Sequence, residues 1–276
     1  MTKRLRVYPS SAAFMWGRVV FTEYASGCLR RILLDANGVR EPFNPIHSER
    51  GELNEDLFEE KLRERGEVTY QREKPFRESI PTTSCQLSGR IDFNIIYDDP
   101  AVPGGKVVVP HELKSTESES QRKSRIQYGK WGLNNVAQLV VYLLVEGVDR
   151  GVLQYTFFER TADGLVAAKP IQRPRSIRKT EAAYDVRILG DSYVEVGGSK
   201  TQFTAFDVLD HVYWAAKVIE DDIVWERPAN YDLKFGSPCT FCPFKNTCNK
   251  WDNGVLSTAS EFIEDARCEL STFHEE

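Results

Sequence analysis

The stretch Ser88-Gly-Arg-Ile-Asp-Phe-Asn-Ile-Ile-Tyr97, followed by Lys106-Val-Val-Val-Pro-His-Glu-Leu-Lys114, decides the fold. Both segments are rich in β-branched and apolar residues, which favour strands. Between them, Asp98-Asp-Pro100 and Pro103-Gly-Gly105 are typical of turns. We therefore predict a β-hairpin over residues 88–114.

Three charged side chains share one face of this predicted hairpin. Side chains alternate between the two faces of a strand, so Glu112 and Lys114 point to one side while Leu113 points into the core. Asp92 can join the first two from the neighbouring strand. Magnesium prefers hard oxygen ligands and is commonly held by one or two carboxylates together with substrate phosphate oxygens. A nearby ammonium stabilises the attacking or leaving oxygen.

That combination suits phosphodiester hydrolysis. For Glu112 and Lys114 alone, the alternative is an ordinary charge pair at the edge of a strand. The residues that follow favour a site, because Gln138 and Tyr142 are four residues apart and so lie on one face of a predicted helix. These two residues could also be a satisfied polar residue and a core aromatic.

A second helix is predicted upstream, over residues 49–65. Its apolar side chains recur at helical spacing. They are Leu53, Leu57, Phe58 and Leu62. The more polar side of its first turns carries Glu55.

In this order, Asp92, Glu112-x-Lys114 and Gln138-x-x-x-Tyr142 resemble the motifs of the PD-(D/E)XK nuclease superfamily, and within it the RecB-like exonucleases. The resemblance implies an α/β fold of the restriction-endonuclease-like type, with a mixed sheet flanked by helices. It implies that the acidic residues bind Mg²⁺ or Mn²⁺ and that the lysine assists the attacking water. The glutamine and tyrosine would lie on a helix beside the DNA.

The resemblance also implies further metal ligands. The backbone carbonyl of Leu113 would be one. In RecB-like nucleases the upstream helix carries Gly, three residues, then His and Glu, and Gly51-Glu-Leu-Asn-Glu55 fits that frame except that Asn54 replaces the histidine. We expect Glu55 to be the third side-chain ligand, with His47 as the alternative. A purely structural Glu55 is a further alternative.

Three cysteines, Cys239-x₂-Cys242-x₅-Cys248, lie in a segment whose prolines and turn residues suit a loop around a metal centre. A fourth thiolate is needed, and we expect Cys28. Four thiolates can bind zinc or a [4Fe–4S] cluster. One distant cysteine with a C-terminal trio is similar to the iron–sulfur nucleases. These include AddB proteins and the CRISPR-associated single-strand exonuclease family, which the chain resembles from about residue 8 to 251.

That resemblance implies a C-terminal iron–sulfur loop stapled to an N-terminal helix. The alternative is a trio of buried reduced cysteines without a metal. No role is assigned to the remaining cysteines, Cys85 and Cys268.

The length and composition limit the possible fold class and cellular location. The chain has 276 residues, 41% of them hydrophobic, which favours one α/β domain over residues 1–276. Its nuclease core would span about 45–160, with iron–sulfur elements around 28 and 237–250. The sequence has neither a run of eighteen apolar residues nor an apolar signal core, so we expect a cytoplasmic protein without a membrane partner.

The net charge of −5 argues against bulk attraction to nucleic acid but does not exclude a nuclease with a narrow basic path. Further elements are expected: a helix from about residue 8, a strand over 151–159, short strands within 185–204 and a helix over 203–222. The basic candidates for a DNA path are Arg30 with Arg31, Lys74 with Arg77, Lys123 with Arg125 and Lys130, and residues 173–179.

The expected function is a metal-dependent exonuclease acting on single-stranded DNA or DNA ends. The resemblance favours 5′-to-3′ polarity and a role in phage recombination, DNA repair or CRISPR spacer processing. Proteins of those systems, or a second copy of the chain, would be its partners. The alternatives are a structure-specific endonuclease with the same centre and a non-catalytic DNA-binding subunit of a helicase–nuclease.

Overall fold

The computed structural model describes residues 6–8, 28–39, 45–66, 69–118, 120–122, 125, 131–162, 164–168, 181–225, 227, 239 and 242–273. It divides into two compact units. The central unit comprises Asn44–Pro75 and Arg90–Ala205, and the terminal unit comprises Met1–Phe43, Phe76–Gly89 and Phe206–Glu276. The single domain expected over residues 1–276 stays a prediction.

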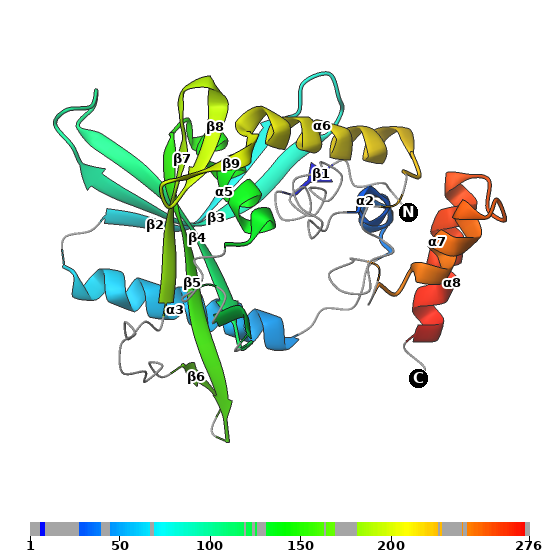
Figure 1. The fold of residues 1–276 in the computed structure, drawn as a ribbon, viewed down its shortest axis with the longest axis horizontal. Coiled ribbons are helices and arrows are strands. Elements are labelled where there is room, and N and C mark those ends of the chain that lie inside the picture. The colour runs from blue at the N-terminus through cyan, green and yellow to red at the C-terminus, as the bar shows by residue number, and fades with distance from the viewer. Residues whose placement is uncertain are drawn as a thin grey trace. The chain divides into compact units, whose positions relative to one another are not determined.

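The central unit is a mixed sheet with helices on both faces, as the sequence predicts (Figure 1). Strand β4 runs parallel to β5, whereas β3–β4, β5–β6, β5–β7, β7–β8 and β8–β9 are antiparallel. Its strand order is β3-β4-β5-β7-β8-β9, with β2 beside β3 and β6 beside β5. The elements are α3 (Pro45–Glu64), β2 (Thr69–Ser79), β3 (Gln86–Asp98), β4 (Lys106–Thr116), α5 (Leu133–Glu146), β5 (Arg150–Thr161), β6 (Gly164–Ala167), β7 (Glu181–Ile188), η2 (Gly190–Ser192), β8 (Tyr193–Val196) and β9 (Ser199–Thr204). Strands β2 and β3 continue into the terminal unit.

The predicted hairpin is confirmed as β3 and β4. Their register pairs Phe93 with His111 and Asp98 with Lys106. The Asp99 amide donates a hydrogen bond of 2.9 Å to the Gly105 carbonyl, which closes the turn between the two strands. The hairpin thus brings the region of Asp92 alongside that of Glu112.

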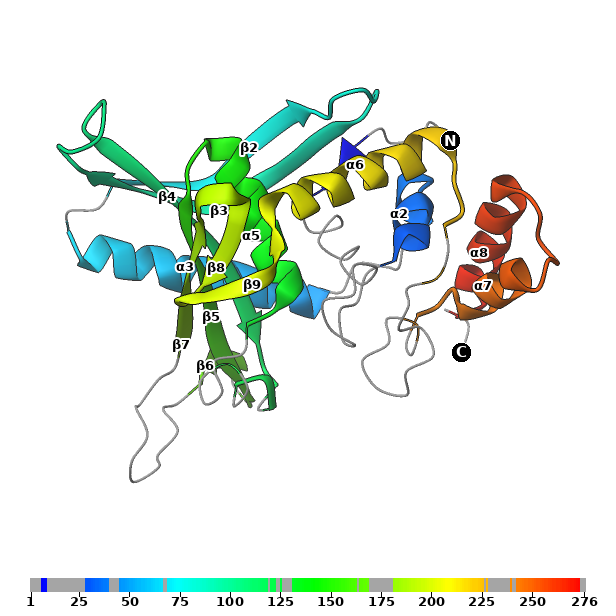
Figure 2. The same cartoon turned by 45° about the horizontal axis from the view of Figure 1, so that its top comes forward.

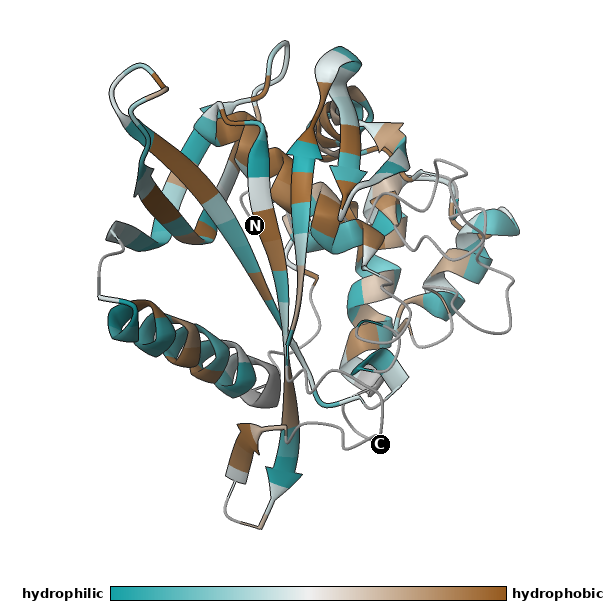
Figure 3. Ribbon diagram, turned by 60° about the vertical axis from the view of Figure 1, so that its left-hand side comes forward, coloured by the Kyte–Doolittle hydropathy of each residue, from teal (hydrophilic) through white to brown (hydrophobic). Residues whose placement is uncertain are grey.

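Helix α3 covers one face of the sheet. Phe58 and Leu62 pack there against Phe93, Ile95 and Leu113, which is the core-facing position expected for Leu113. The rings of Phe58 and Phe93 meet edge to face, with centroids 4.9 Å apart. Figure 3 shows hydrophobic and hydrophilic bands alternating along the helix. This amphipathic pattern is why residues 49–65 predict a helix correctly.

Helix α5 covers the opposite face, and Gly151 of β5 permits its close approach. A Cβ atom at this position would lie 2.8 Å from both Leu143 of α5 and the Pro110 carbonyl oxygen. The helix ends at Gly147, whose φ of 66° is the left-handed conformation that glycine adopts most easily. Close packing here positions Gln138 and Tyr142 over the sheet.

The terminal unit contains β1 (Arg6–Val7), α2 (Leu29–Ala36), α6 (Ala205–Asp221), α7 (Lys245–Asp252) and α8 (Ala259–Phe273). Helices α7 and α8 pack together (Figure 2), with the Trp251 and Phe262 rings 5.7 Å apart. The predicted strands over 151–159 and 185–204 and the predicted helix over 203–222 are confirmed. The helix expected from residue 8 falls on 9–27, outside the described residues. Among the helices of the described part of the chain, none has the length and apolarity needed to cross a membrane.

Candidate active site

Asp92, Glu112 and Lys114 converge in the central unit, as the sequence predicts. Asp92 Oδ2 accepts a hydrogen bond of 2.7 Å from the Leu113 amide, which ties β3 to β4 at the site. Lys114 Nζ forms an ion pair with Glu112 Oε1. Glu112 is completely buried. An acidic pair and a lysine thus sit where two strands of the hairpin run side by side.

The electrostatics of this centre favour a bound cation. Burial, followed by the charge of Glu112, raises the pKa of Asp92 to about 8. Burial also raises the pKa of Glu112, although Lys114 opposes this. Burial acts to lower the pKa of Lys114, but the two carboxylates outweigh it and the pKa is raised. A buried pair of like charges disfavours double ionisation, and an added cation relieves that repulsion.

Gln138 and Tyr142 complete a chain of contacts around the charged pair. Lys114 Nζ donates to Gln138 Oε1 at 3.1 Å, and Gln138 Nε2 donates to Tyr142 Oη at 2.7 Å. Burial, followed by the charge of the nearby Glu112, raises the pKa of the Tyr142 hydroxyl. The structure therefore brings together all four of these sequence-predicted residues.

The expected placement of these two residues beside DNA stays a prediction. Tyr142 is only 2% exposed and Gln138 9% exposed in the described structure. Their contacts fix the positions of Lys114 and Glu112. Buried polar groups need such partners, which is why the amide and the hydroxyl pair with each other.

Glu55 of α3 lies near the same centre. Burial and the negative charge of Asp92 raise its pKa, and Glu55 in turn contributes to the raised pKa of Glu112. Its role as the third carboxylate ligand stays a prediction. Asn54, which replaces the histidine of the resembled motif, is buried. His47 lies in α3, but its side chain is outside the described residues.

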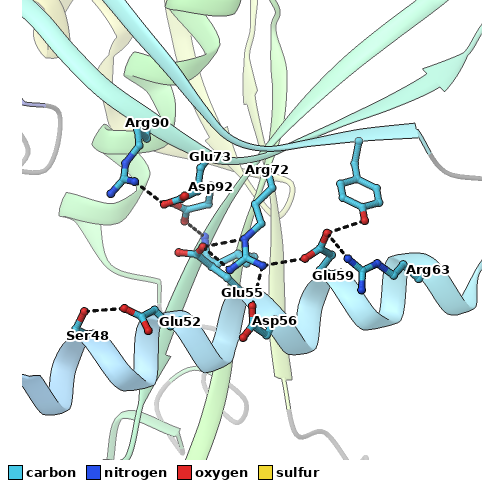
Figure 4. Close-up of polar contacts among 12 residues, drawn as sticks. Ser48, Glu52, Glu55, Asp56, Glu59, Arg63, Arg72, Glu73, Arg90 and Asp92 are labelled. Carbon is cyan, nitrogen blue, oxygen red and sulfur yellow. Dashed lines mark hydrogen bonds and ion pairs between the residues drawn. The ribbon is translucent and has the colours of Figure 1, made fainter.

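Two residues that sequence reasoning missed adjoin the centre, and Figure 4 shows both. Arg72 of β2 contacts Glu55. The neighbouring Glu73 pairs with Arg90 at 2.7 Å, and its charge helps to raise the pKa of Asp92. Glu73 has a φ of 50°, in the left-handed region that is uncommon for a residue with a side chain. Exposed and half-buried positions alternate regularly along β2 through Glu73, so the sequence pattern gives no sign of this left-handed residue.

The donor set fits a hard divalent cation. Both carboxylate oxygens of Glu112 are buried, and Oε1 faces Lys114 Nζ. Oxygen ligands from carboxylates are those that Mg²⁺ and Mn²⁺ prefer. Among the described residues, however, no three His, Cys, Asp or Glu side chains are grouped closely enough to hold an ion as they stand. The Leu113 carbonyl stays a predicted ligand.

The four cysteines of the predicted cluster all lie in the terminal unit. Cys28 immediately precedes α2. Burial raises the pKa of the Cys28 thiol to about 12, and the other three thiols reinforce this, with Cys248 the strongest. The four thiols are therefore close enough to interact electrostatically. Of the remaining cysteines, Cys85 is buried and its thiol approaches the Ala216 carbonyl at 3.5 Å, while Cys268 is exposed.

A buried arginine adjoins these thiols. Arg30 is 3% exposed, and its Nη2 donates to Asp252 Oδ1 at 2.6 Å, which joins α2 to α7. Its guanidinium opposes the rise that burial causes in the pKa of Cys248, as does that of Arg227. A positive charge here favours thiolate ligands. Arg30 therefore lies beside the Cys248 thiol, and its expected part in a DNA path stays a prediction.

Two of the other basic candidates have partners in the described chain. Lys74 is paired with Glu146 at 2.8 Å. The guanidinium of Arg125 lies over the Tyr155 ring, 4.8 Å from its centroid. Lys123, Lys130 and residues 173–179 lie outside the described residues.

Comparisons with known proteins give weak structural similarities. No protein-family model matches the chain, and no curated protein matches it. The structure is similar to a phage-related exonuclease from Haemophilus somnus 129PT, with 12% identity over 79% of this chain and 95% of the other, at a TM-score of 0.47. It is also similar to an alkaline exonuclease from Laribacter hongkongensis, with 10% identity over 80% of this chain and 88% of the other, at a TM-score of 0.41. A third similar structure is that of a protein designated SSO0001, with 15% identity over 89% of each chain, at a TM-score of 0.42. At these values the similarities assign neither a family nor an activity.

Proposed function

We propose that this protein is a divalent-metal-dependent nuclease that hydrolyses phosphodiester bonds in DNA at Asp92, Glu112 and Lys114. The observation that carries the proposal is the fully buried Glu112, whose ion pair with Lys114 lies beside a second carboxylate of raised pKa. Burying such charges together costs free energy, which favours a functional reason for their presence. A purely structural charge pair would not need the second carboxylate.

Each residue has a role that follows from its contacts. Asp92 and Glu112, with Glu55 as the third carboxylate, would hold the metal, which when bound lowers the pKa of a water and offsets phosphate charge. Asp92 must give up its proton for this, because a protonated carboxyl is a poor ligand. Lys114 places an ammonium beside the reacting oxygens. Gln138 and Tyr142 keep that ammonium and the Glu112 carboxylate in place.

We infer an exonuclease acting on single strands from the 5′ end, with Mg²⁺ or Mn²⁺, in phage recombination, repair or CRISPR spacer processing. The motif resemblance of Asp92, Glu112-x-Lys114 and Gln138-x-x-x-Tyr142 supports this narrower reading.

The terminal unit supports a second part of the proposal, a [4Fe–4S] cluster held by Cys28, Cys239, Cys242 and Cys248. Mutual interaction of the four thiols and the adjoining Arg30 charge support a thiolate-ligated centre. Such a centre would contribute folding free energy by linking segments far apart in the chain. Zinc bound by the same residues is the outcome that metal analysis would distinguish.

Cleavage of three labelled substrates tests the activity. Single-stranded DNA labelled at the 5′ end, the same strand labelled at the 3′ end, and a covalently closed single-stranded circle are incubated with anaerobically purified protein and Mg²⁺ or Mn²⁺. We expect shortening of both linear strands, early release of the 5′ label and an intact circle. Cleavage of the circle would indicate an endonuclease. If all three stay intact while the protein binds metal, the chain is a non-catalytic subunit.

A further inference from the structure

Arg72 of β2 holds the carboxylate of Glu55, the third carboxylate of the proposed site. Its Nε donates to Glu55 Oε2 at 3.3 Å, and its Nη2 lies 3.3 Å from the same oxygen. Both contacts end on Oε2, and Oε1 takes neither a hydrogen bond nor an ion pair among the described residues. One oxygen is therefore fixed while the other is left for a further ligand.

The guanidinium itself is held in place by α3. Its Nη1 donates to Asp56 Oδ1 at 2.7 Å and to Glu59 Oε2 at 2.8 Å. The centroid of the Phe93 ring lies 6.0 Å from the guanidinium carbon. Figure 4 shows the arginine reaching from the strand into the row of acidic side chains along the helix. A group with this many fixed contacts is preorganised.

Glu55 needs such a partner because its neighbours are acidic. Asp92 and Glu73 repel the Glu55 carboxylate, and Arg72 attracts it through two contacts of 3.3 Å. Without the arginine, Glu55 would face two like charges with a free choice of rotamer. Repulsion would then turn the carboxylate away from the centre.

We propose that Arg72 is a positioning residue that orients Glu55 as a metal ligand, an inference that rests on the proposed nuclease function. The arginine touches neither substrate nor metal; it acts through the carboxylate. Residues that orient a metal ligand from outside the coordination sphere typically contribute roughly 10- to 100-fold to metal affinity.

Two effects of removing Arg72 oppose each other. Loss of a positive charge near the site would strengthen cation binding, whereas loss of orientation would weaken it. Solvent screening limits the first effect, because Arg72 and its partner Asp56 are both partly exposed. Lost orientation typically weakens metal binding roughly 10- to 100-fold, so metal binding should weaken overall.

Direct binding of Mn²⁺, followed by electron paramagnetic resonance of the free ion, tests this without a cleavage assay. The full-length variants are Arg72→Gln, Arg72→Lys, Glu55→Gln and the double variant Glu55→Gln/Arg72→Gln. Arg63→Gln is the matched control, because Arg63 contacts Glu59 at 2.9 Å from the same helix. Melting temperatures of all variants are measured in parallel.

We expect Arg72→Gln to raise the Mn²⁺ dissociation constant roughly 10- to 100-fold and Arg63→Gln to change it less than about twofold. Arg72→Lys should fall between them, because one ammonium cannot serve three carboxylates at once. In the Glu55→Gln background, Arg72→Gln should have little further effect, since coupled residues are not additive.

Unchanged or tighter Mn²⁺ binding in Arg72→Gln would overturn the inference. The inference would also be wrong if Arg72→Gln weakened Mn²⁺ binding equally in the wild-type and Glu55→Gln backgrounds. The arginine would then act by a route that does not involve the Glu55 carboxylate. If Arg72→Gln does not fold, Arg72→Lys decides by the same criteria. A wild-type protein that binds no Mn²⁺ contradicts the proposed metal site itself, whereas normal wild-type binding and cleavage with no effect of Arg72 contradicts this inference alone.

Discussion

Raising the pH should destabilise the metal-free protein, because folding places Asp92 where its protonated form is favoured. Its pKa is raised from 3.8 to about 8 by burial and by Glu112. Between these two values the folded state binds more protons than the unfolded state. The free energy of unfolding therefore falls as pH rises towards 8. This stabilisation is fully present below the pKa of Asp92 in the unfolded state, and it is lost above the pKa of Asp92 in the folded state.

The size of this effect follows from the shift. Each pKa unit corresponds to about 1.4 kcal/mol, and the interaction with Lys114 spreads the titration, so we expect a loss of about 2–4 kcal/mol between about pH 5 and about pH 9. About 1 kcal/mol shifts the melting temperature of a unit this size by roughly 2–4 °C. The melting temperature should thus fall by roughly 5–15 °C.

Scanning calorimetry in a chelator measures this for the wild type and two variants. Asp92→Asn removes the titrating group and should flatten the profile, leaving a smaller slope from Glu112. Asp98→Asn, at the exposed end of the same strand, is the matched control and should follow the wild type. Saturating Mg²⁺ should restore the melting temperature at high pH, because a ligand that binds only the folded state stabilises it.

A metal-free profile that is flat, or that rises between about pH 5 and about pH 9, would refute the reasoning for Asp92. So would identical slopes for the wild type and Asp92→Asn. Either result would mean that the carboxyl is ionised in the folded state at neutral pH.

Three further outcomes follow from buried contacts. Tyr142→Phe leaves the Gln138 amide without its acceptor, which should cost about 1–3 kcal/mol in chemical denaturation and lower the cleavage rate; full stability with a normal rate would contradict the contact chain. Gly151→Ala forces a shift of the backbone at 2.8 Å and should cost about 1–3 kcal/mol, whereas an unchanged denaturation midpoint would contradict the close approach of α5. Cys248→Ser should remove the brown colour and the iron of the purified protein, with Cys85→Ser as the matched control that keeps both; a colourless wild type with one zinc would instead assign the centre to zinc.

Much of the fold could be predicted because its signals are local. The hairpin follows from two strand-like segments and a glycine-rich turn, and α3 follows from apolar spacing. The convergence of Asp92 with Glu112 and Lys114 follows from strand alternation alone. These features depend on residues close together in the sequence, where periodicity is informative.

The parts that the sequence could not predict depend on burial and on backbone exceptions. Spacing placed Gln138 and Tyr142 on one helix face but could not show that the sheet would bury them against Lys114. Glu73 has a left-handed backbone, which the regular alternation along β2 does not reveal. Arg72 adjoins the site only through a tertiary contact with α3, which leaves no signature in a single sequence.

The most direct test of the central claim is cleavage of end-labelled single-stranded DNA with Mg²⁺ by the wild type and by Glu112→Gln, a substitution that keeps the shape of the side chain and removes its charge. The account predicts metal-dependent cleavage by the wild type that a chelator abolishes. It predicts a loss of at least roughly a hundredfold in Glu112→Gln, with the far-ultraviolet circular dichroism unchanged. Cleavage by Glu112→Gln at the wild-type rate would contradict the assignment of this centre.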